Sequence, residues 1–282
     1  MTDLMTETRK TQSQMDTRAH GLRVLVVNDD GIHSPGIALM ERFARRLSED
    51  VWVVAPEFEN SGAGHSLSLA DPIRVRQLDE QKFALRGTPT DCVVLACRHL
   101  MKDRRPDLVL SGVNRGANLA EDVTYSGTIA GAMEGTLLDI PSLCMSQVFR
   151  DRDDVKWHTA ERFGFELLSR LVEVGWPRHV FININFPPLE PDEVRGVRVT
   201  RQGRRQESSI QVHDRVDARG FPYFWLSLSH EENIYPADTD LTAVAEGSIS
   251  LTPLQLDMTN EAGLNHLSET LVGPAKIRAA QV

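Results

Sequence analysis

The sequence contains little cysteine, no excess of basic residues and no long hydrophobic run. Three cysteines occur among 282 residues, namely Cys92, Cys97 and Cys144, and no two of them form a Cys-x-x-Cys pair. This odd and scattered set argues against a disulfide framework and is typical of a reduced, cytoplasmic compartment. Lysine and arginine total 31 against 40 acidic residues, for a net charge of −9. That balance argues against generic nucleic-acid binding, which needs a basic surface.

No apolar stretch approaches the roughly 18–20 residues that a membrane-spanning helix needs. Residues 1–20 are polar and lack the hydrophobic segment of a signal peptide. We therefore expect a cytoplasmic protein without a membrane partner, in which residues 1–21 form a disordered N-terminal extension. A hydrophobic share of 41% and a charged share of 25% are those of an ordinary globular protein with a sizeable core.

Strand and helix patterns alternate between residue 22 and about residue 188. Apolar runs of four to seven residues are typical of strands that are buried on both faces of a parallel sheet. They occur at 24–27, 51–56, 108–112, 142–146 and 180–186, with shorter candidates at 73–75 and 83–85. Helical spacing of apolar residues lies between them, at 35–48, 90–101, 128–138 and 158–174. This order predicts a doubly wound α/β core.

The pattern changes after residue 188. Short β-like runs at 197–200, 223–228 and 248–252 are separated by polar segments. We expect a β-rich extension over 189–257 with an exposed arm, a feature that often serves oligomerisation. The predicted organisation is a single α/β domain over 22–260, followed by a C-terminal tail over 261–282.

The end of the first predicted strand carries two adjacent carboxylates, Asp29 and Asp30, followed by Gly31. In open parallel sheets, ligands bind at the carboxyl ends of the strands. Two carboxylates there repel each other unless a cation lies between them. The glycine allows the backbone to turn, so that both side chains can converge on one ion. The motif therefore indicates a metal site.

Two further predicted strands end in polar loops. One loop, 55–66, contains Ser61, and another, 111–118, contains Asn114 and runs on toward Ser126. Carboxylate, hydroxyl and amide oxygens are hard donors that suit Mg²⁺, Mn²⁺ or Ca²⁺ rather than zinc. Backbone N–H groups at the start of the helix after Ser126 form a cradle for an anion. A divalent ion beside such a cradle indicates metal-assisted phosphoryl chemistry.

The sequence resembles the SurE (survival protein E) family of 5′-nucleotidases over residues 22–258. The matching motifs follow one another in order, at 27–32, 35–37, 54–56, 61–62, 87–93, 106–114, 118–119, 122–123, 125–128, 183–187 and 249–254. The resemblance implies a three-layer α/β/α Rossmann-like fold. It also implies hydrolysis of nucleoside 5′-monophosphates to nucleoside and phosphate, with 3′-monophosphates and short polyphosphate as further candidates.

The same resemblance implies the site residues and the partners. One Mg²⁺ or Mn²⁺ per subunit would be held by Asp29, Asp30, Ser61 and Asn114, the two aspartates being the catalytic residues. The phosphate would lie among Gly62, Asn118, Ser126, Gly127 and Thr128. Homodimers or homotetramers with exchanged C-terminal segments are implied as well. The chain departs from the family pattern at Arg115, at Ala120 and over 203–240.

Several alternatives stay open at this level. Direct attack by water is favoured over an aspartyl-phosphate intermediate, because carboxylates that bind a metal are poorer nucleophiles. A phospho-acceptor signalling module and a nucleotide-binding scaffold without turnover are the rival functions. Residues 88–91 are expected to cap a helix. His65 lies near the site in sequence and is either part of it or a plain loop histidine, whereas no chemistry requires His33. Arg201, Arg204 and Arg205 are expected on a solvated or intersubunit surface, unless one of them steers phosphate into the cleft.

Overall fold

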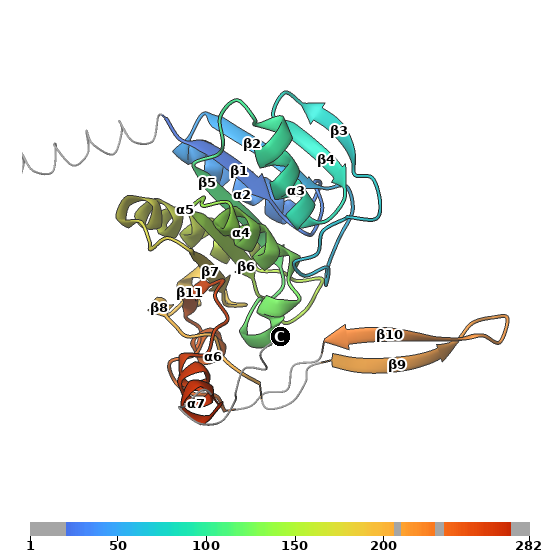
Figure 1. Ribbon diagram of the computed structural model, residues 1–282, viewed down its shortest axis with the longest axis vertical. Helices are drawn as coiled ribbons and strands as arrows, with labels where there is room; N and C mark the ends of the chain where they lie inside the picture. The colour runs from blue at the N-terminus through green and yellow to red at the C-terminus, as the bar shows by residue number, and fades with distance from the viewer. Residues whose placement is uncertain (1–20, 206–209, 229–233, 272–282) are drawn as a thin grey trace, which may run out of the picture.

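A computed structural model describes residues 21–205, 210–228 and 234–271, so the expectations for residues 1–20 and 272–282 lie outside it. Within these residues the central element is a nine-stranded sheet (Figure 1). Its order is β3 (Arg74–Asp79), β4 (Lys82–Arg86), β2 (Asp50–Pro56), β1 (Arg23–Val27), β5 (Leu108–Arg115), β6 (Ser142–Gln147), β7 (Val180–Phe186), β11 (Ile249–Gln255) and β8 (Val197–Val199). The six strands from β4 to β7 are parallel, whereas β3 runs antiparallel to β4 and β11 antiparallel to β7. β8 pairs with β11 in parallel.

Helices cover both faces of this sheet. Val24 and Val26 of β1 pack on one side with α2 (Pro35–Leu47) and α5 (Trp157–Val174). The alternate residues Leu25 and Val27 pack on the other side with α3 (Pro89–Leu95), and α4 (Gly127–Leu137) contacts both α3 and β5 on that side. These four side chains of β1 are fully buried because successive residues of a strand point to opposite faces and helices cover both. The prediction of a three-layer α/β/α fold is confirmed.

The helix predicted over 90–101 is shorter and less regular than expected. It begins at Pro89, ends as an α-helix at Leu95, and continues as a π-turn, η1 (Ala96–Leu100). The Thr88 side chain accepts a hydrogen bond from the Asp91 N–H, and the Asp91 carboxylate accepts one from the Thr88 N–H. This capping box confirms that residues 88–91 cap the helix.

The extension after β7 has two parts. β8 and β11 continue the central sheet. The short helix η3 (Pro191–Glu193) lies between β7 and β8, and α6 (Asp240–Ala245) precedes β11. A separate antiparallel hairpin, β9 (Ile210–Val216) and β10 (Pro222–Leu228), projects away from the sheet (Figure 1). α7 (Glu261–Leu271) lies where the sequence predicted a tail. In the described part of the chain, no helix has both the length and the apolar character required to cross a membrane.

Removing the cap of α3 is expected to destabilise the protein. The change Thr88→Ala leaves the Asp91 N–H without its acceptor, and we expect a loss of about 1 kcal/mol in the free energy of unfolding. Urea denaturation of the two proteins measures the difference. Thr88→Ser, which keeps the hydroxyl, is the control and should behave as the unaltered protein. Equal losses in both variants would contradict the capping role.

Candidate active site

Loops at the carboxyl ends of β1, β2 and β5 meet at one edge of the sheet. The Ile32 N–H donates to the Pro56 carbonyl at 2.8 Å and the Asn60 N–H donates to the Asp29 carbonyl at 2.7 Å, which ties the loop after β1 to the loop after β2. A cavity of about 560 Å³ opens here. Six predicted site residues line it, namely Asp29, Ser61, Gly62, Asn114, Asn118 and Ser126. Residues far apart in the sequence are therefore brought together as the strand-end pattern predicted.

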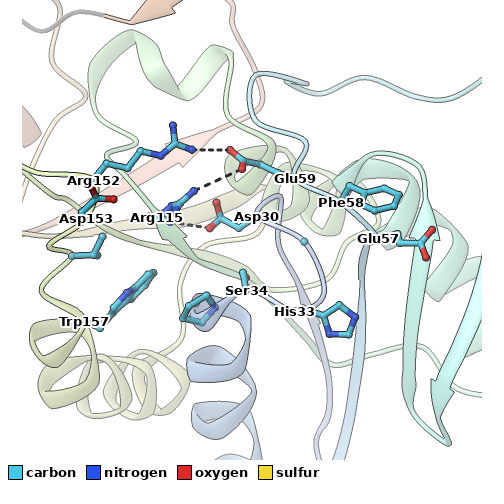
Figure 2. A pocket seen from close by; sticks show the side chains of 14 residues that line it. Asp30, His33, Ser34, Glu57, Phe58, Glu59, Arg115, Arg152, Asp153 and Trp157 are labelled. Carbon is cyan, nitrogen blue, oxygen red and sulfur yellow. Dashed lines mark hydrogen bonds and ion pairs between the residues drawn. The ribbon is translucent and has the colours of Figure 1, made fainter.

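A second cavity of about 480 Å³ adjoins the first, and Asp30 lines it (Figure 2). The Asp30 carboxylate accepts a hydrogen bond from the Arg115 N–H at 2.9 Å. Glu59, Arg115 and Arg152 line both cavities and so form the divide between them. Asp29 and Asp30 thus line two adjoining cavities that share these three charged side chains.

Asp29 is buried against the start of α4. The Thr128 hydroxyl donates a hydrogen bond to its Oδ1 atom. A Cβ atom on Gly127 would lie 2.7 Å from the Asp29 Cβ, closer than such atoms approach in proteins, so this position requires glycine. Because Gly127 has no side chain, the N-terminus of α4 can lie directly against the Asp29 carboxylate, where the helix dipole favours negative charge.

The electrostatic environment of the two carboxylates is unfavourable without a cation. Burial, followed by the neighbouring charge of Asp30, raises the pKa of Asp29 to about 7, although the hydrogen bonds from Thr128 oppose this. Burial also raises the pKa of Asp30, opposed by Arg115. A divalent cation between them would supply the missing positive charge, since an opposite charge at close range favours the ionised form.

The remaining predicted ligands offer neutral oxygens. The exposed Ser61 hydroxyl donates to Glu59 Oε1 at 2.9 Å, which leaves its lone pairs available. Asn114 Nδ2 donates to the Gly116 carbonyl at 3.1 Å, so its Oδ1 atom is the one that could bind a cation. Within the described residues, no group of three or more His, Cys, Asp or Glu could hold a metal. Two carboxylates, a hydroxyl and an amide fit a hard divalent ion such as Mg²⁺ or Mn²⁺.

The predicted phosphate-binding residues differ in what they contact. Ser126 is the N-cap of α4, and its hydroxyl accepts from the Ile129 N–H at 3.0 Å. Asn118 is buried, and its Nδ2 atom donates to the Ser146 hydroxyl at 2.7 Å. The Thr128 hydroxyl is committed to Asp29, and Gly62 has a positive φ of 79°. The phosphate role of these residues stays a prediction.

Sequence reasoning missed Glu59 and Arg152 and misplaced Arg205. The Glu59 carboxylate forms long ion pairs with the guanidinium groups of Arg152 and Arg115, with N–O distances of 3.6 and 3.7 Å (Figure 2). Only its position two residues before Ser61 could have pointed to it.

Arg201 and Arg204 are exposed as expected, but the prediction for Arg205 was wrong because that side chain is buried in an ion pair with Asp122. His65 pairs with Glu134 of α4 at 3.0 Å.

Comparison with known proteins identifies the family of the chain. The family profile described as Survival protein SurE matches residues 24–209. The chain belongs to the SurE family. It is 54% identical over 252 residues to the 5′-nucleotidase SurE of Parvibaculum lavamentivorans, covering 89% of this chain and 91% of that protein. Identity to the 5′-nucleotidase SurE of Rhodopseudomonas palustris is 54% over 254 residues, covering 89% of this chain and 100% of that protein.

A solved structure supports the same assignment. The crystal structure of the SurE protein from Aquifex aeolicus superposes with a TM-score of 0.74 at 38% sequence identity. The similarity covers 87% of this chain and 98% of that chain. The SurE fold therefore extends over nearly the whole described chain, including strands beyond the parallel core.

The buried Asp29 carboxyl predicts how stability depends on pH when metal is removed. Its folded-state pKa of about 7 lies above the ordinary 3.8, so between these values the folded protein holds a proton that the unfolded chain has lost. Stability of the chelated protein should therefore fall as pH rises through this window. Urea unfolding at about pH 5 and about pH 7.5 tests this, with a shallower fall expected for Asp29→Asn. The control Asp153→Asn should keep the full fall, and an identical fall in Asp29→Asn would refute the assignment.

Proposed function

We propose that this SurE protein is a metal-dependent phosphomonoesterase that hydrolyses nucleoside 5′-monophosphates to nucleoside and inorganic phosphate. The observation that carries this proposal is the pair Asp29 and Asp30, partly buried at a strand end with the N-terminus of α4 resting on Asp29. This arrangement suits a divalent cation next to a phosphoryl group. The relatives named 5′-nucleotidase SurE support the choice of a nucleotide as substrate.

Asp29, Asp30, Ser61 and Asn114 would hold the cation. When bound, such an ion polarises the phosphoryl group and lowers the pKa of a coordinated water. The N–H groups of Thr128 and Ile129 already donate to Asp29 and to the Ser126 hydroxyl. The Gly127 N–H, which has no acceptor within the helix, would bind a phosphoryl oxygen as charge shifts in the transition state. Thr128 orients Asp29 through its hydroxyl, and Ser126 fixes the start of the helix. These side chains therefore position the reacting groups before the substrate enters.

The roles of the two aspartates favour attack by water over a covalent intermediate. Asp29 accepts a hydrogen bond from the Thr128 hydroxyl, and Asp30 accepts one from the Arg115 N–H, so each carboxylate is held in place by a neighbouring donor. A carboxylate that is held in this way and binds a cation is a poor nucleophile. Isolation of a stable phosphorylated Asp29 or Asp30 would overturn this part of the proposal.

Phosphate release from a panel of nucleotides tests the activity directly. The panel contains 5′- and 3′-nucleoside monophosphates and short polyphosphate, assayed after chelation and again after Mg²⁺ or Mn²⁺ is restored. We expect release that depends on the added ion and is greatest with 5′-monophosphates. Binding of mononucleotides without any release would favour a nucleotide-binding scaffold.

Neutralising one predicted ligand should abolish turnover without unfolding the protein. In Asp30→Asn the amide oxygen can still accept from the Arg115 N–H, but the ion loses a charged ligand. We expect kcat/KM to fall by more than about a hundredfold, with the far-ultraviolet circular dichroism spectrum unchanged. Asp153→Asn, which alters a carboxyl lining the same cavity, is the matched control and should stay active. Near-normal turnover in Asp30→Asn would count against the whole site.

We also propose that the β9–β10 hairpin mediates assembly of two or four copies of this chain. An isolated two-stranded hairpin is marginally stable, and this one exposes large apolar side chains on β10. Phe224, Trp225 and Leu226 are 63%, 65% and 69% exposed. A second copy of the chain would bury these side chains, with exchange of C-terminal segments between subunits.

A charge on the hairpin should weaken this assembly. For Trp225→Glu we expect a smaller molar mass in size-exclusion chromatography with light scattering, because burying an unpaired carboxylate in an interface is costly. Val174→Glu places the same charge on an apolar residue that is 76% exposed at the end of α5, away from the hairpin. It should leave the molar mass unchanged. Equal masses for both variants would argue against the hairpin as the interface.

A further inference from the structure

Arg205 joins the C-terminal extension to the turn that precedes α4. Its Nη1 and Nη2 atoms donate to the two carboxylate oxygens of Asp122 at 3.1 and 2.9 Å, and Nη1 also donates to the Leu119 carbonyl at 3.2 Å. The side chains of Arg205 and Asp122 are only 7% and 5% exposed. Such a two-pronged, buried ion pair is geometrically specific, unlike most surface pairs.

The turn held by Arg205 leads directly into the predicted phosphate site. It is a 3-10 helix, η2 (Ala120–Thr124), with Leu119 as its N-cap. The Asp122 carbonyl accepts from the N–H groups of Tyr125 and Ser126, each at 3.0 Å. Ser126 in turn caps α4. The guanidinium therefore fixes Asp122, and the backbone of Asp122 fixes the first residue of the helix.

The C-terminal extension contacts the η2 turn at a second point. Asp240 of α6 accepts from the Ala120 N–H at 3.0 Å and from the Gly203 N–H at 2.8 Å, and Gln202 Nε2 donates to the Ala120 carbonyl at 2.8 Å. Ala120 has a φ of 51°, a left-handed conformation that favours glycine. The turn is thus held in an unfavourable backbone conformation by contacts from residues 202–205 and 240.

Asp122 also lines the larger cavity, where an unpaired carboxylate would oppose an anionic ligand. Arg205 places a positive charge beside Asp122, and its Nη1 atom also pairs, at 3.4 Å, with the more exposed Glu121 carboxylate. Without Arg205, a negative charge would remain next to the space that phosphate is proposed to occupy. The ion pair therefore has an electrostatic consequence for the site in addition to its geometric one.

From these contacts we infer that Arg205 is a positioning residue for the phosphate site: it holds the Asp122 turn so that Ser126 starts α4 in place, and it offsets the negative charge of Asp122 beside the bound phosphate. This inference rests on the proposed phosphomonoesterase function. It distinguishes Arg205 from Arg201, which lies in the same segment but is exposed and forms an ion pair with the exposed Asp238 at 3.1 Å.

Steady-state kinetics with the metal-loaded, full-length protein test the inference. For Arg205→Met we expect the KM for a nucleoside 5′-monophosphate and the inhibition constant of inorganic phosphate to rise about tenfold, because both ligands meet the unpaired Asp122. Combining it with Asp122→Asn should return the phosphate inhibition constant toward that of the unaltered protein, since the repelling charge is gone. Arg201→Met is the matched control and should change neither constant.

A purely structural role would give a different pattern. It would lower kcat in proportion to the folded fraction and leave KM and the phosphate inhibition constant within about twofold, which would overturn the inference. If Arg205→Met does not fold, Arg205→Lys and the double variant decide by the same two constants. Arg205→Lys keeps the positive charge but loses the two parallel hydrogen bonds to Asp122, so we expect a smaller rise in KM and in the phosphate inhibition constant.

Failure of the proposed function has a separate signature. If the unaltered protein neither releases phosphate from any nucleotide nor binds inorganic phosphate in calorimetry with metal present, the phosphomonoesterase proposal and this inference fall together. If the unaltered protein is active and binds phosphate, while Arg205→Met does so with unchanged constants, only the positioning role of Arg205 is refuted.

Discussion

The repulsion between two adjacent carboxylates at the end of β1 is the constraint around which the active-site edge is organised. Asp29 is buried and carries a raised pKa, which a folded protein tolerates only where other groups compensate. The compensation comes from the start of α4, through Thr128, and in the proposed holoenzyme from a cation. Gly127 is part of the same arrangement, because any side chain there would push the helix away from Asp29.

The parallel sheet explains why this constraint can be met by residues so far apart in the chain. β1 lies between β2 and β5, and all three strands run in the same direction, so their final residues and following loops emerge together. Burial of β1 on both faces anchors Asp29 and Asp30 on a rigid strand. Ser61 then arrives on the loop after β2 and Asn114 at the end of β5, and the strand order determines that these two positions flank the end of β1.

The C-terminal extension has a larger part in the site than its distance in sequence suggests. Asp240 and residues 202–205 hydrogen-bond to the turn before α4. Leu226 and Ser227 of the hairpin line the larger cavity. The α/β core therefore does not complete the cavity by itself. A contact that orders the extension would also order the turn that carries Ser126, which links the proposed assembly of subunits to the geometry of the site.

The sequence by itself determined the α/β core and pointed to a metal site at the end of the first strand, because both depend on local signals. The full ligand set is implied by the family resemblance and stays a prediction. Buried strands appear as continuous apolar runs such as Val24 to Val27, and hard donors stand out where such runs end, as at Asp29 and Asp30. β9 was not predicted, since its exposed residues show no burial pattern, and the helix over 90–101 was predicted too long, since its end depends on packing.

Only the tertiary structure decided the partners of individual charges. Arg205 lies in the same basic segment as Arg201 and Arg204, yet it alone of the three is buried, because the fold places Asp122 and the Leu119 carbonyl within reach of its guanidinium. Glu59 and Arg152 likewise gain their place on the divide between the cavities from loops that meet in space. Pairing of charges depends on long-range contacts, and no local pattern in the chain encodes them.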